Sequence, residues 1–185
     1  MKAIFPAIAI ATSGLLGLAS FGAHAADGTI TITGTVSDST CSINGKATGT
    51  SADKSITLPT VSAGSLSAAG NVGGTSSPTD LVLALSGCSG TATKAIARFE
   101  NGPTVDQTSG YLNNSGTATK VQVRLLNGQM QPINITTNAN NDISTNSATI
   151  AGGAANLKYF AQYYSTGVAT AGTVNTSVQY TMQYQ

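Results

Sequence analysis

The last eleven residues, NTSVQYTMQYQ (Asn175–Gln185), decide how the fold of this chain is interpreted. Val178, Tyr180, Met182 and Tyr184 alternate with polar residues, which is the period of two typical of a strand with one buried face. Most chains end in a frayed polar tail. This one ends in mid-strand, with an aromatic residue next to last, and the pattern predicts a half-buried strand that runs to the C-terminus.

Further windows of strand-like composition precede this one and are separated by Gly, Asn and Ser. They are residues 29–36, 55–58, 80–85, 94–99, 120–125, 133–136 and 157–164, and the last window begins at residue 173. Residues 70–78 and 138–146 are predicted as surface loops. Short strands with turn signals between them favour an all-β sandwich, and about 160 residues suit one domain.

The first 25 residues have the pattern of a secretory signal peptide. Lys2 is followed by an apolar run from residue 3 to residue 18 and by the small-x-small site Ala23-His24-Ala25. Pro6 interrupts the run, so that no uninterrupted apolar stretch reaches the roughly 18 to 20 residues of a membrane-spanning helix. We therefore expect residues 1–25 to be removed on export.

Cleavage after Ala25 limits the chemistry of the mature chain. It removes His24, the only histidine, and reduces the 8 Lys and Arg by one (Lys2), which leaves 7 against 7 Asp and Glu. A Ser-His-Asp or Cys-His site is then excluded, and a balanced charge offers no electrostatic footprint for nucleic acid. We expect no cofactor, no metal and no enzymatic activity. Glu100 and Asp106 are the candidate carboxylate pair for another class of function, a small hydrolase, but no sequence pattern identifies such a site.

The two cysteines, Cys41 and Cys88, are expected to form one disulfide. An exported chain meets an oxidising environment, and an even pair of cysteines there is most simply one bond. Two lone cysteines without histidine do not fill a tetrahedral zinc shell. A closed loop of this length stabilises the fold by roughly 4 kcal/mol on the chain-entropy estimate.

The start of the mature chain has a second alternating pattern. Ile30, Ile32, Gly34 and Val36 fall on one face, and threonines fall on the other. The plain interpretation is the first edge strand of the sandwich. Two features argue against it: no hairpin signal follows, and Gly is a poor interior strand residue that often marks the close approach of another backbone.

These features together resemble the major subunits of chaperone–usher fimbriae, of the type 1 pilin kind. The resemblance rests on the run of Ile30, Ile32, Gly34 and Val36 a few residues before Cys41, and on the second cysteine, Cys88. In that family a glycine lies fourteenth from the end and an aromatic residue is penultimate, and here these are Gly172 and Tyr184. The resemblance covers the mature chain from end to end.

The resemblance implies an immunoglobulin-like sandwich that lacks its last strand and is completed by a donor strand from another subunit. Residues 26–37 would be the donor-strand extension and residues 38–185 the pilin domain. The donor side chains would be Ile30, Ile32 and Val36, with Gly34 where the groove is shallow. The acceptor groove and the strand that contacts the chaperone would include Gly172, Val178, Tyr180, Met182, Tyr184 and Gln185.

The implied function is that of a structural subunit of an adhesive surface fimbria. A periplasmic chaperone would deliver the subunit to an outer-membrane usher, where the extension of the next subunit replaces the chaperone strand. The partners would be identical or related pilin subunits, the chaperone and the usher, and a host-surface or glycan receptor is left open. The protein would pass through the periplasm to the cell surface.

One alternative belongs to another class of function: a secreted carbohydrate-binding β-sandwich, or a minor or tip adhesin subunit. Tyr159, Tyr163 and Tyr164 form the nearest candidate for a sugar-binding platform. A tip adhesin of this family usually has an additional lectin domain, and the mature chain has no room for one. A self-contained sugar-binding module would purify as a stable monomer, whereas a pilin would aggregate or remain bound to its chaperone.

Overall fold

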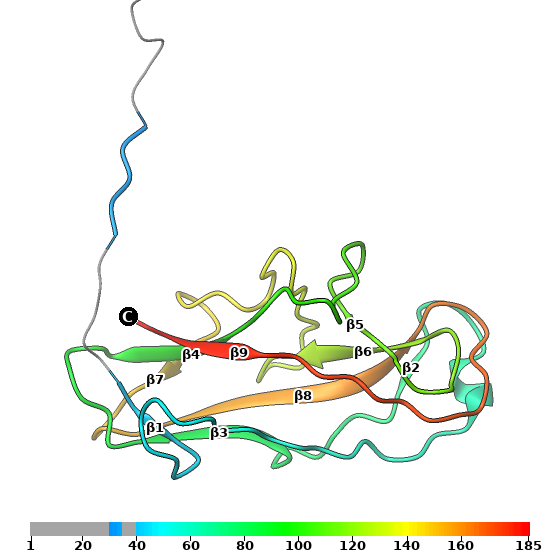
Figure 1. Cartoon of the computed structure of the whole chain (residues 1–185), viewed down its shortest axis with the longest axis horizontal. Coiled ribbons are helices and arrows are strands. Elements are labelled where there is room, and N and C mark those ends of the chain that lie inside the picture. Colours follow the sequence, from blue (N-terminus) through cyan, green and yellow to red (C-terminus); the bar gives the residue numbers. More distant parts are fainter. Residues whose placement is uncertain (1–29, 35–39) are drawn as a thin grey trace, which may run out of the picture. The chain divides into compact units, whose positions relative to one another are not determined.

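The computed structural model describes residues 30–34 and 40–185. The predicted signal peptide, Val36 and most of the predicted extension lie outside the described residues. The chain divides into two compact units between Thr35 and Val36. In the first unit, the described residues belong to no helix or strand, and Ile30 and Ile32 are each 90% exposed. The second unit, residues 40–185, is called the body here and carries all the described strands (Figure 1).

The larger sheet of the body is antiparallel and has the order β1-β3-β8-β6-β5, and β2 also pairs with β8. Its strands are β1 (Ser42–Ile43), β2 (Val72–Gly73), β3 (Leu81–Ser86), β5 (Leu112–Asn113), β6 (Val121–Leu126) and β8 (Ala155–Ser165). The smaller sheet is also antiparallel and has the order β7-β4-β9. It contains β4 (Lys94–Phe99), β7 (Ala148–Thr149) and β9 (Tyr180–Tyr184).

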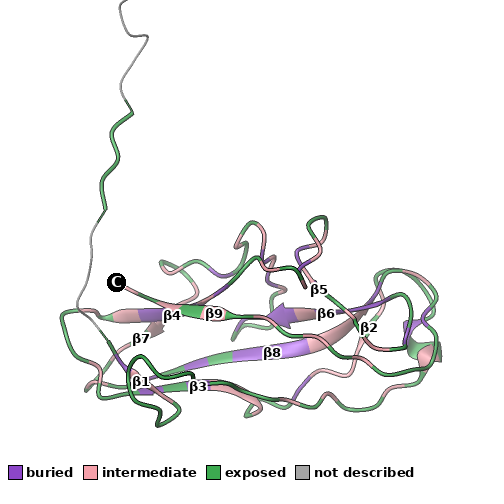
Figure 2. Cartoon of the chain, in the orientation of Figure 1, coloured by how far each residue is buried: buried purple, intermediate pink, exposed green. Residues whose placement is uncertain are grey.

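The core lies between the two sheets, where alternate side chains of the longer strands meet. β8 buries Leu157, Tyr159 and Ala161 on one face, and these pack with Leu83 of β3 and Phe99 of β4 in one hydrophobic cluster. Figure 2 shows β8 largely buried, whereas β9 is half-buried or exposed along its length. Burial of apolar area between the sheets is the main force that holds them together.

Tyr159 joins the two sheets by a polar contact as well. Its hydroxyl accepts a hydrogen bond from the backbone N–H of Ala97 at 3.1 Å, and its ring packs edge-on against Phe99 with the centroids 5.1 Å apart. Burial of the phenol raises its pKa from the ordinary value of 10.0 to about 12, and the bond from Ala97 partly offsets that rise. A buried hydroxyl that has a partner contributes to stability instead of opposing it.

The described residues contain one short helical turn, the 3₁₀ helix Ala63–Leu66, whose first turn is capped by the Ser62 side chain. Across residues 30–34 and 40–185, no helix is long and apolar enough to cross a membrane. The cysteine prediction is confirmed, because Cys41 and Cys88 form a disulfide. The all-β prediction is confirmed too, and four of the predicted strand windows correspond to β3, β4, β6 and β8.

Two predicted strand windows within the body form no strand. The prediction of a strand at residues 133–136 is wrong. Ile133 and Ile135 are buried, but the chain around them turns. Met130 and Asn138 have positive φ angles on either side, and only isolated bridges form there. Residues 55–58 lie in a segment that pairs with no strand. Within residues 173–184, only Tyr180–Tyr184 forms a ladder.

Candidate functional site: a groove beside the last strand

The last strand, β9, is paired along one edge only. Lys94 and Gln185 exchange both backbone hydrogen bonds, and Glu100 N–H donates to Gln179 at 2.9 Å. In an antiparallel ladder these paired residues recur every second position. The odd-numbered residues of β9 therefore point their backbone groups at β4, and the even-numbered ones present N–H and C=O groups to the opposite edge. No other described strand pairs with that edge.

The side chains of this C-terminal segment alternate over a longer range than the strand itself. From residue 174 to residue 184 every even-numbered residue is half-buried, and every odd-numbered one is exposed. The half-buried residues are Val174, Thr176, Val178, Tyr180, Met182 and Tyr184, and all six line a groove on the body. They form its first wall.

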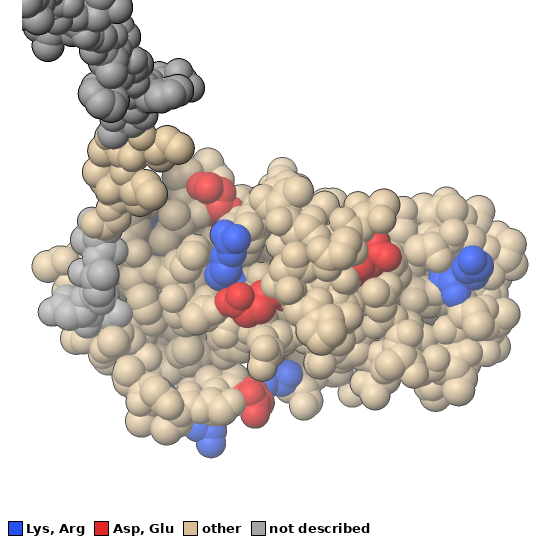
Figure 3. All heavy atoms as spheres, turned by 45° about the horizontal axis from the view of Figure 1, so that its top comes forward, with Lys and Arg blue, Asp and Glu red and all other residues tan. Residues whose placement is uncertain are grey.

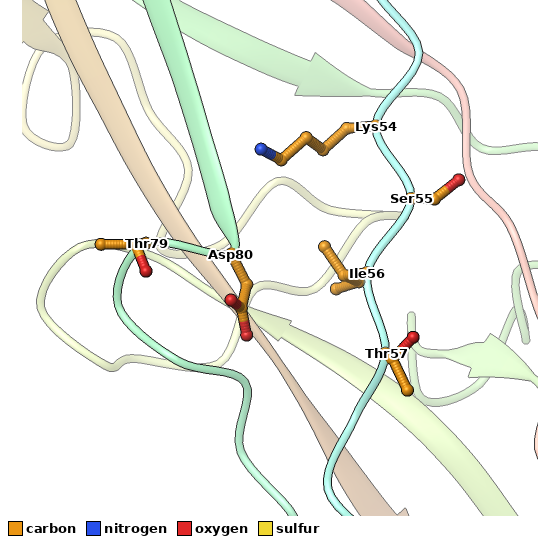
Figure 4. Close-up of a pocket in the computed structure, with 6 residues that line it drawn as sticks. All are labelled: Lys54, Ser55, Ile56, Thr57, Thr79 and Asp80. Carbon is orange, nitrogen blue, oxygen red and sulfur yellow. The ribbon is translucent and has the colours of Figure 1, made fainter.

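The opposite wall is the segment from Ala52 to Leu58, which is far away in the sequence. Figure 4 shows its strand-like alternation: Lys54 and Ile56 extend toward the start of β3 and Asp80, whereas Ser55 and Thr57 point away. Within the described part of the chain, the backbone of residues 53–61 forms no hydrogen bond with any strand. A smaller recess of about 330 Å³ separates this segment from Thr79 and Asp80. The second wall is thus an extended segment with unpaired edges.

The groove between the two walls has a volume of about 1080 Å³ and an apolar floor. The floor consists of buried side chains from the facing sheets, among them Leu83, Phe99, Leu125 and Tyr159, and of the half-buried Leu81. Hydrophobic core residues therefore line a space that is open to solvent. Exposed apolar surface beside an unpaired strand edge is unfavourable in water and is typical of a binding site for another chain.

Two tyrosines of the first wall reach across one end of the groove. The hydroxyl of Tyr180 donates to the carbonyl of Ala52 at 2.9 Å. Burial and the charge of Asp53 both raise the pKa of Tyr180. Burial also raises the pKa of Tyr184, and a hydrogen bond from the Cys41 backbone opposes that rise. The Tyr180 bond joins the first wall to the second, whereas Tyr184 contacts Cys41, which lies outside the second wall. Among the described residues, no hydrogen bond joins the two walls beside Val174, Thr176 and Val178.

Charged side chains are sparse on the face of the molecule that Figure 3 displays. In the described ranges, no three His, Cys, Asp or Glu side chains gather closely enough to hold a metal ion. Glu100 accepts a bond from Thr181, and Asp106 is engaged by Ser109 and Thr108, whose hydrogen bonds lower its pKa. Each carboxylate is thus occupied by neighbouring polar groups.

The predicted acceptor residues fall into two sets. Val178, Tyr180, Met182 and Tyr184 line the groove together, whereas Gly172 and Gln185 lie outside its lining. Gly172 passes so close to the backbone of Thr117 and Ala118 that a Cβ atom there would lie 2.4 Å from the Ala118 nitrogen. The structure therefore gives this glycine a packing role. Gln185 pairs its backbone with Lys94.

The predicted donor residues Ile30, Ile32 and Gly34 belong to the first unit. A Cβ atom added at Gly34 would meet no atom within 4 Å. Nothing in its own described surroundings therefore requires a glycine at this position.

The tyrosines considered for a sugar platform do not gather on one surface. Tyr159 is buried, and Tyr163 lines the groove. Tyr164 contacts a different ring, Tyr111, edge-on with the centroids 5.0 Å apart, and lies under the guanidinium of Arg124. Because successive strand residues point to opposite faces, Tyr163 and Tyr164 do not act together.

Sequence reasoning missed the second wall and the start of the first. Val174 and Thr176 continue the alternation of Val178 toward the N-terminus, so extending the same period would have found them. Ile56 and Leu58 lay in a predicted strand window, but no local signal places that window opposite residues more than a hundred positions later. Only the tertiary fold brings these walls together.

Comparisons with known proteins show the family and the fold of this chain. Residues 30–185 match the family model described as "Fimbrial protein". The chain is 40% identical over 176 residues to the major fimbrial subunit SMF-1 of Stenotrophomonas maltophilia, covering 92% of this chain and 99% of the other. It is 39% identical to the F17 fimbrial protein of Escherichia coli, covering 93% and 96%. A chain from the structure of a chaperone–usher pilus has a TM-score of 0.56 at 25% identity, covering 86% and 96%.

Proposed function

This chain belongs to the fimbrial protein family and is a structural pilus subunit with the expected immunoglobulin-like sandwich; from that premise, we propose that its subunits polymerise by donor-strand exchange. In this mechanism residues 26–37 of one subunit fill the groove of the next. Head-to-tail contacts of this kind make an open filament, because each subunit offers one donor and one acceptor. The filament would be an adhesive fimbria at the cell surface.

The proposal rests on one observation: β9 pairs with β4 along one edge, and its other edge has no partner among the described strands. Its even-numbered residues present free backbone groups and half-buried apolar side chains to the same open groove. A strand added there would gain a ladder of backbone hydrogen bonds from β9 and place alternate side chains on the apolar floor. Backbone bonds would supply affinity, and the alternate side chains would supply specificity.

The N-terminal segment has the complementary pattern. Ile30 and Ile32 are both 90% exposed, and the threonines between them occupy the other face. Burying each isoleucine in the groove stabilises the contact by about 1.5–3 kcal/mol. Val36, with the same spacing, lies outside the described residues. An apolar groove beside an open strand edge and an exposed segment with alternating apolar residues therefore occur in one chain.

The proposal extends to the route of assembly and to the absence of enzymatic activity. Export would begin with removal of residues 1–25, and a periplasmic chaperone would occupy the groove until an outer-membrane usher exchanges it for the next subunit. Such a protector is needed because an exposed apolar groove beside an open strand edge promotes aggregation. Polymerisation is driven by this exchange and requires no cofactor.

The deciding experiment deletes residues 26–37 from the full chain and examines the bacterial surface by electron microscopy. We expect the truncated subunit to be exported and oxidised but to form no fibres. A matched pair of point variants refines the test: Ile32→Asp changes the apolar face and should abolish fibres, whereas Thr31→Asp changes the opposite face and should leave most of them. Normal fibres from the truncated chain would exclude donor-strand exchange through this segment.

A further inference from the structure

The outer face of the larger sheet, on the side opposite the groove, carries a second group of side chains. β6 and β8 direct Val123 and Tyr163 into the groove, so the residues that alternate with them face outward. The outward residues lie side by side, because Gln122 pairs with Tyr164 and Arg124 pairs with Gln162 in the ladder between the two strands. Tyr111, just before β5, joins them through its ring. The outer-face cluster, as we call it, consists of Tyr111, Gln122, Arg124, Gln162 and Tyr164.

Two tyrosine rings form the apolar part of the outer-face cluster. Tyr111 and Tyr164 are half-buried and pack edge-on, with their planes inclined by 70°. The guanidinium of Arg124 lies over the Tyr164 ring, 5.9 Å from its centroid. Val72 of β2, which pairs with Tyr164 in the ladder, is 39% exposed. Across residues 30–34 and 40–185, neither phenol oxygen of the two rings forms a hydrogen bond. Apolar carbon and free hydroxyl groups therefore occur together on this face.

The polar members of the cluster are held in place by hydrogen bonds. Gln122 is only 7% exposed; its Nε2 donates to Asn113 Oδ1 at 3.1 Å, and its Oε1 accepts from Ser109 Oγ at 3.2 Å. Gln162 Oε1 accepts two bonds from Arg124, from Nε at 2.9 Å and from Nη2 at 2.6 Å. Side chains that are fixed in advance lose little conformational entropy when a ligand binds.

Arg124 is a half-buried cation without an anionic partner in the described part of the chain. Its bonds to the neutral amide of Gln162 use Nε and Nη2, so the N–H groups of Nη1 remain for another acceptor. Lys158, which is exposed on the outward side of β8, adds a second positive charge. The Asp106 carboxylate reaches the cluster only through the Ser109 hydroxyl. The charge on this face therefore complements an anionic ligand.

We propose that the outer-face cluster binds a sugar that carries a carboxylate, at one site on each subunit. The apolar face of the sugar ring would pack on the tyrosine rings, and its hydroxyls would exchange hydrogen bonds with Gln122 and Gln162. The carboxylate would accept from the free N–H groups of Arg124. This inference goes beyond the proposed function and holds however the subunits are joined.

The surroundings of the cluster favour a sugar over other ligands. Both edges of β6 and of β8 are already paired within the sheet, so this face offers side chains and no free backbone ladder to a peptide. Two cations are too few to hold the repeated phosphates of a nucleic acid. A single site of this size would bind weakly, but a fibre repeats it in every subunit, and simultaneous contacts raise the overall affinity for a surface with many sugars.

Purified fibres of the full chain test the site by titration with three sugars: sialyllactose, a hyaluronan tetrasaccharide and neutral lactose. We expect at least one of the two carboxylated sugars to bind, and lactose to bind about tenfold more weakly than sialyllactose if the carboxylate comes from a sialic acid. Binding of the tetrasaccharide alone would assign a uronic acid. The chain has no Trp, so tyrosine fluorescence reports binding directly.

Substitutions assign the binding to the cluster. Arg124→Gln should raise the Kd of the carboxylated sugar about tenfold, and Tyr164→Leu should raise it about threefold to tenfold. Lys158→Gln is the matched control, because it removes the same charge from the same face about 13 Å from Gln162 along the strand, and should change the Kd less than about twofold. Electron microscopy confirms that each variant still forms fibres. If Arg124→Gln formed none, Tyr164→Leu and the sugar series on unaltered fibres would decide.

The outcomes separate this site from the proposed function. Absence of binding by both carboxylated sugars at millimolar concentration, or an equal loss from Lys158→Gln and Arg124→Gln, would overturn the site. Lactose that binds as tightly as the carboxylated sugars would overturn the role of Arg124. Fibres that survive deletion of residues 26–37 would instead overturn donor-strand exchange and leave the sugar site intact.

Discussion

Strands β8 and β9 belong to the same body and carry similar side chains, but their surroundings differ. β8 has partners on both edges, β3 and β2 on one side and β6 on the other, and its inward residues are buried except Tyr163, which is half-buried. β9 pairs with β4 alone, and its inward residues are only half-buried. The difference shows that an alternating pattern of apolar residues specifies a strand but does not specify how many neighbouring strands it has.

The comparison has a consequence for stability. Side chains on β8 contribute to the folded body whether or not a partner is bound, because they are already out of water. Side chains on β9 would complete their burial only when the groove is filled. Substitutions on the two strands should therefore affect different measurements, and the predictions below separate these effects.

The largest expected effect is that of Leu157→Ala on β8. Leu157 is 3% exposed and lies in the main core cluster, so its truncation leaves a cavity and costs about 2–5 kcal/mol. We expect little exported subunit to accumulate and no fibres to form, as measured by immunoblot and electron microscopy. Gln183→Ala, on the exposed face of β9, is the control and should leave both unchanged. A normal level of folded Leu157→Ala subunit would show that the groove, rather than the core, limits stability.

A somewhat smaller effect is expected from raising the pH. The pKa of Tyr159 is about 12 in the folded chain against an ordinary value of 10.0, so ionisation of this phenol favours the unfolded chain. Its contribution is complete below pH 10 and is lost as the pH rises toward 12, which removes roughly 2–3 kcal/mol. Guanidinium unfolding followed at several pH values measures this loss.

Tyr159→Phe supplies the control for that measurement. The variant is less stable at neutral pH because the Ala97 N–H group loses its partner, but its stability should fall less steeply between pH 10 and pH 12. An equally steep fall would mean that other tyrosines, such as Tyr180 and Tyr184 in the groove, dominate the alkaline transition.

Val178→Ala, two residues before β9 on the same wall of the groove, should have a smaller effect that appears mainly in the fibre. Removing two carbon atoms from a side chain that becomes buried on assembly costs about 1.5 kcal/mol in the filled groove. Because Val178 is half-buried in the free body, the unfolding of the isolated subunit should change by less. The temperature at which fibres dissociate in detergent, compared with subunit unfolding, measures both. If the fibre dissociation temperature and the subunit unfolding temperature fell equally, side chains beside the groove would stabilise the free subunit as much as those of β8 do, which contradicts the prediction.

The smallest expected effect is that of Tyr180→Phe, which deletes the bond to Ala52. A single hydrogen bond of this kind contributes about 1 kcal/mol. We expect faster amide exchange in residues 53–58, because the second wall loses one of its links to the first. Tyr111→Phe, whose ring contacts Tyr164 away from the groove, should leave that exchange unaltered.

The sequence predicted the strands that resemble β8 better than the site that includes β9. Lys94–Phe99 is correct to the residue, and β3, β6 and β8 are correct to within two residues at either end. Their alternating patterns are long, and turn residues bound them. At Ile133 and Ile135 the same alternation accompanies turns, because nearby asparagines adopt left-handed backbone angles that end any ladder.

Half of the groove was predictable, and half was not. One wall follows from the alternation that ends at Tyr184, and the resemblance to pilins explains why it is open. The other wall, Ala52 to Leu58, forms no hydrogen-bonded strand and meets the first only through folding.

In the proposed fibre, where N-terminal segments link the subunits, the disulfide between Cys41 and Cys88 would carry mechanical load. Tension on a donor segment enters the body at Cys41, immediately before β1, and β1 holds β3 by only two paired residues. Two residue pairs would peel apart one after the other under a steady pull. The covalent bond instead passes the tension directly to Cys88, just beyond the end of β3, so that the strain spreads into the larger sheet. The disulfide would therefore keep the N-terminal end of the body attached to the larger sheet under a tension that could separate β1 from β3.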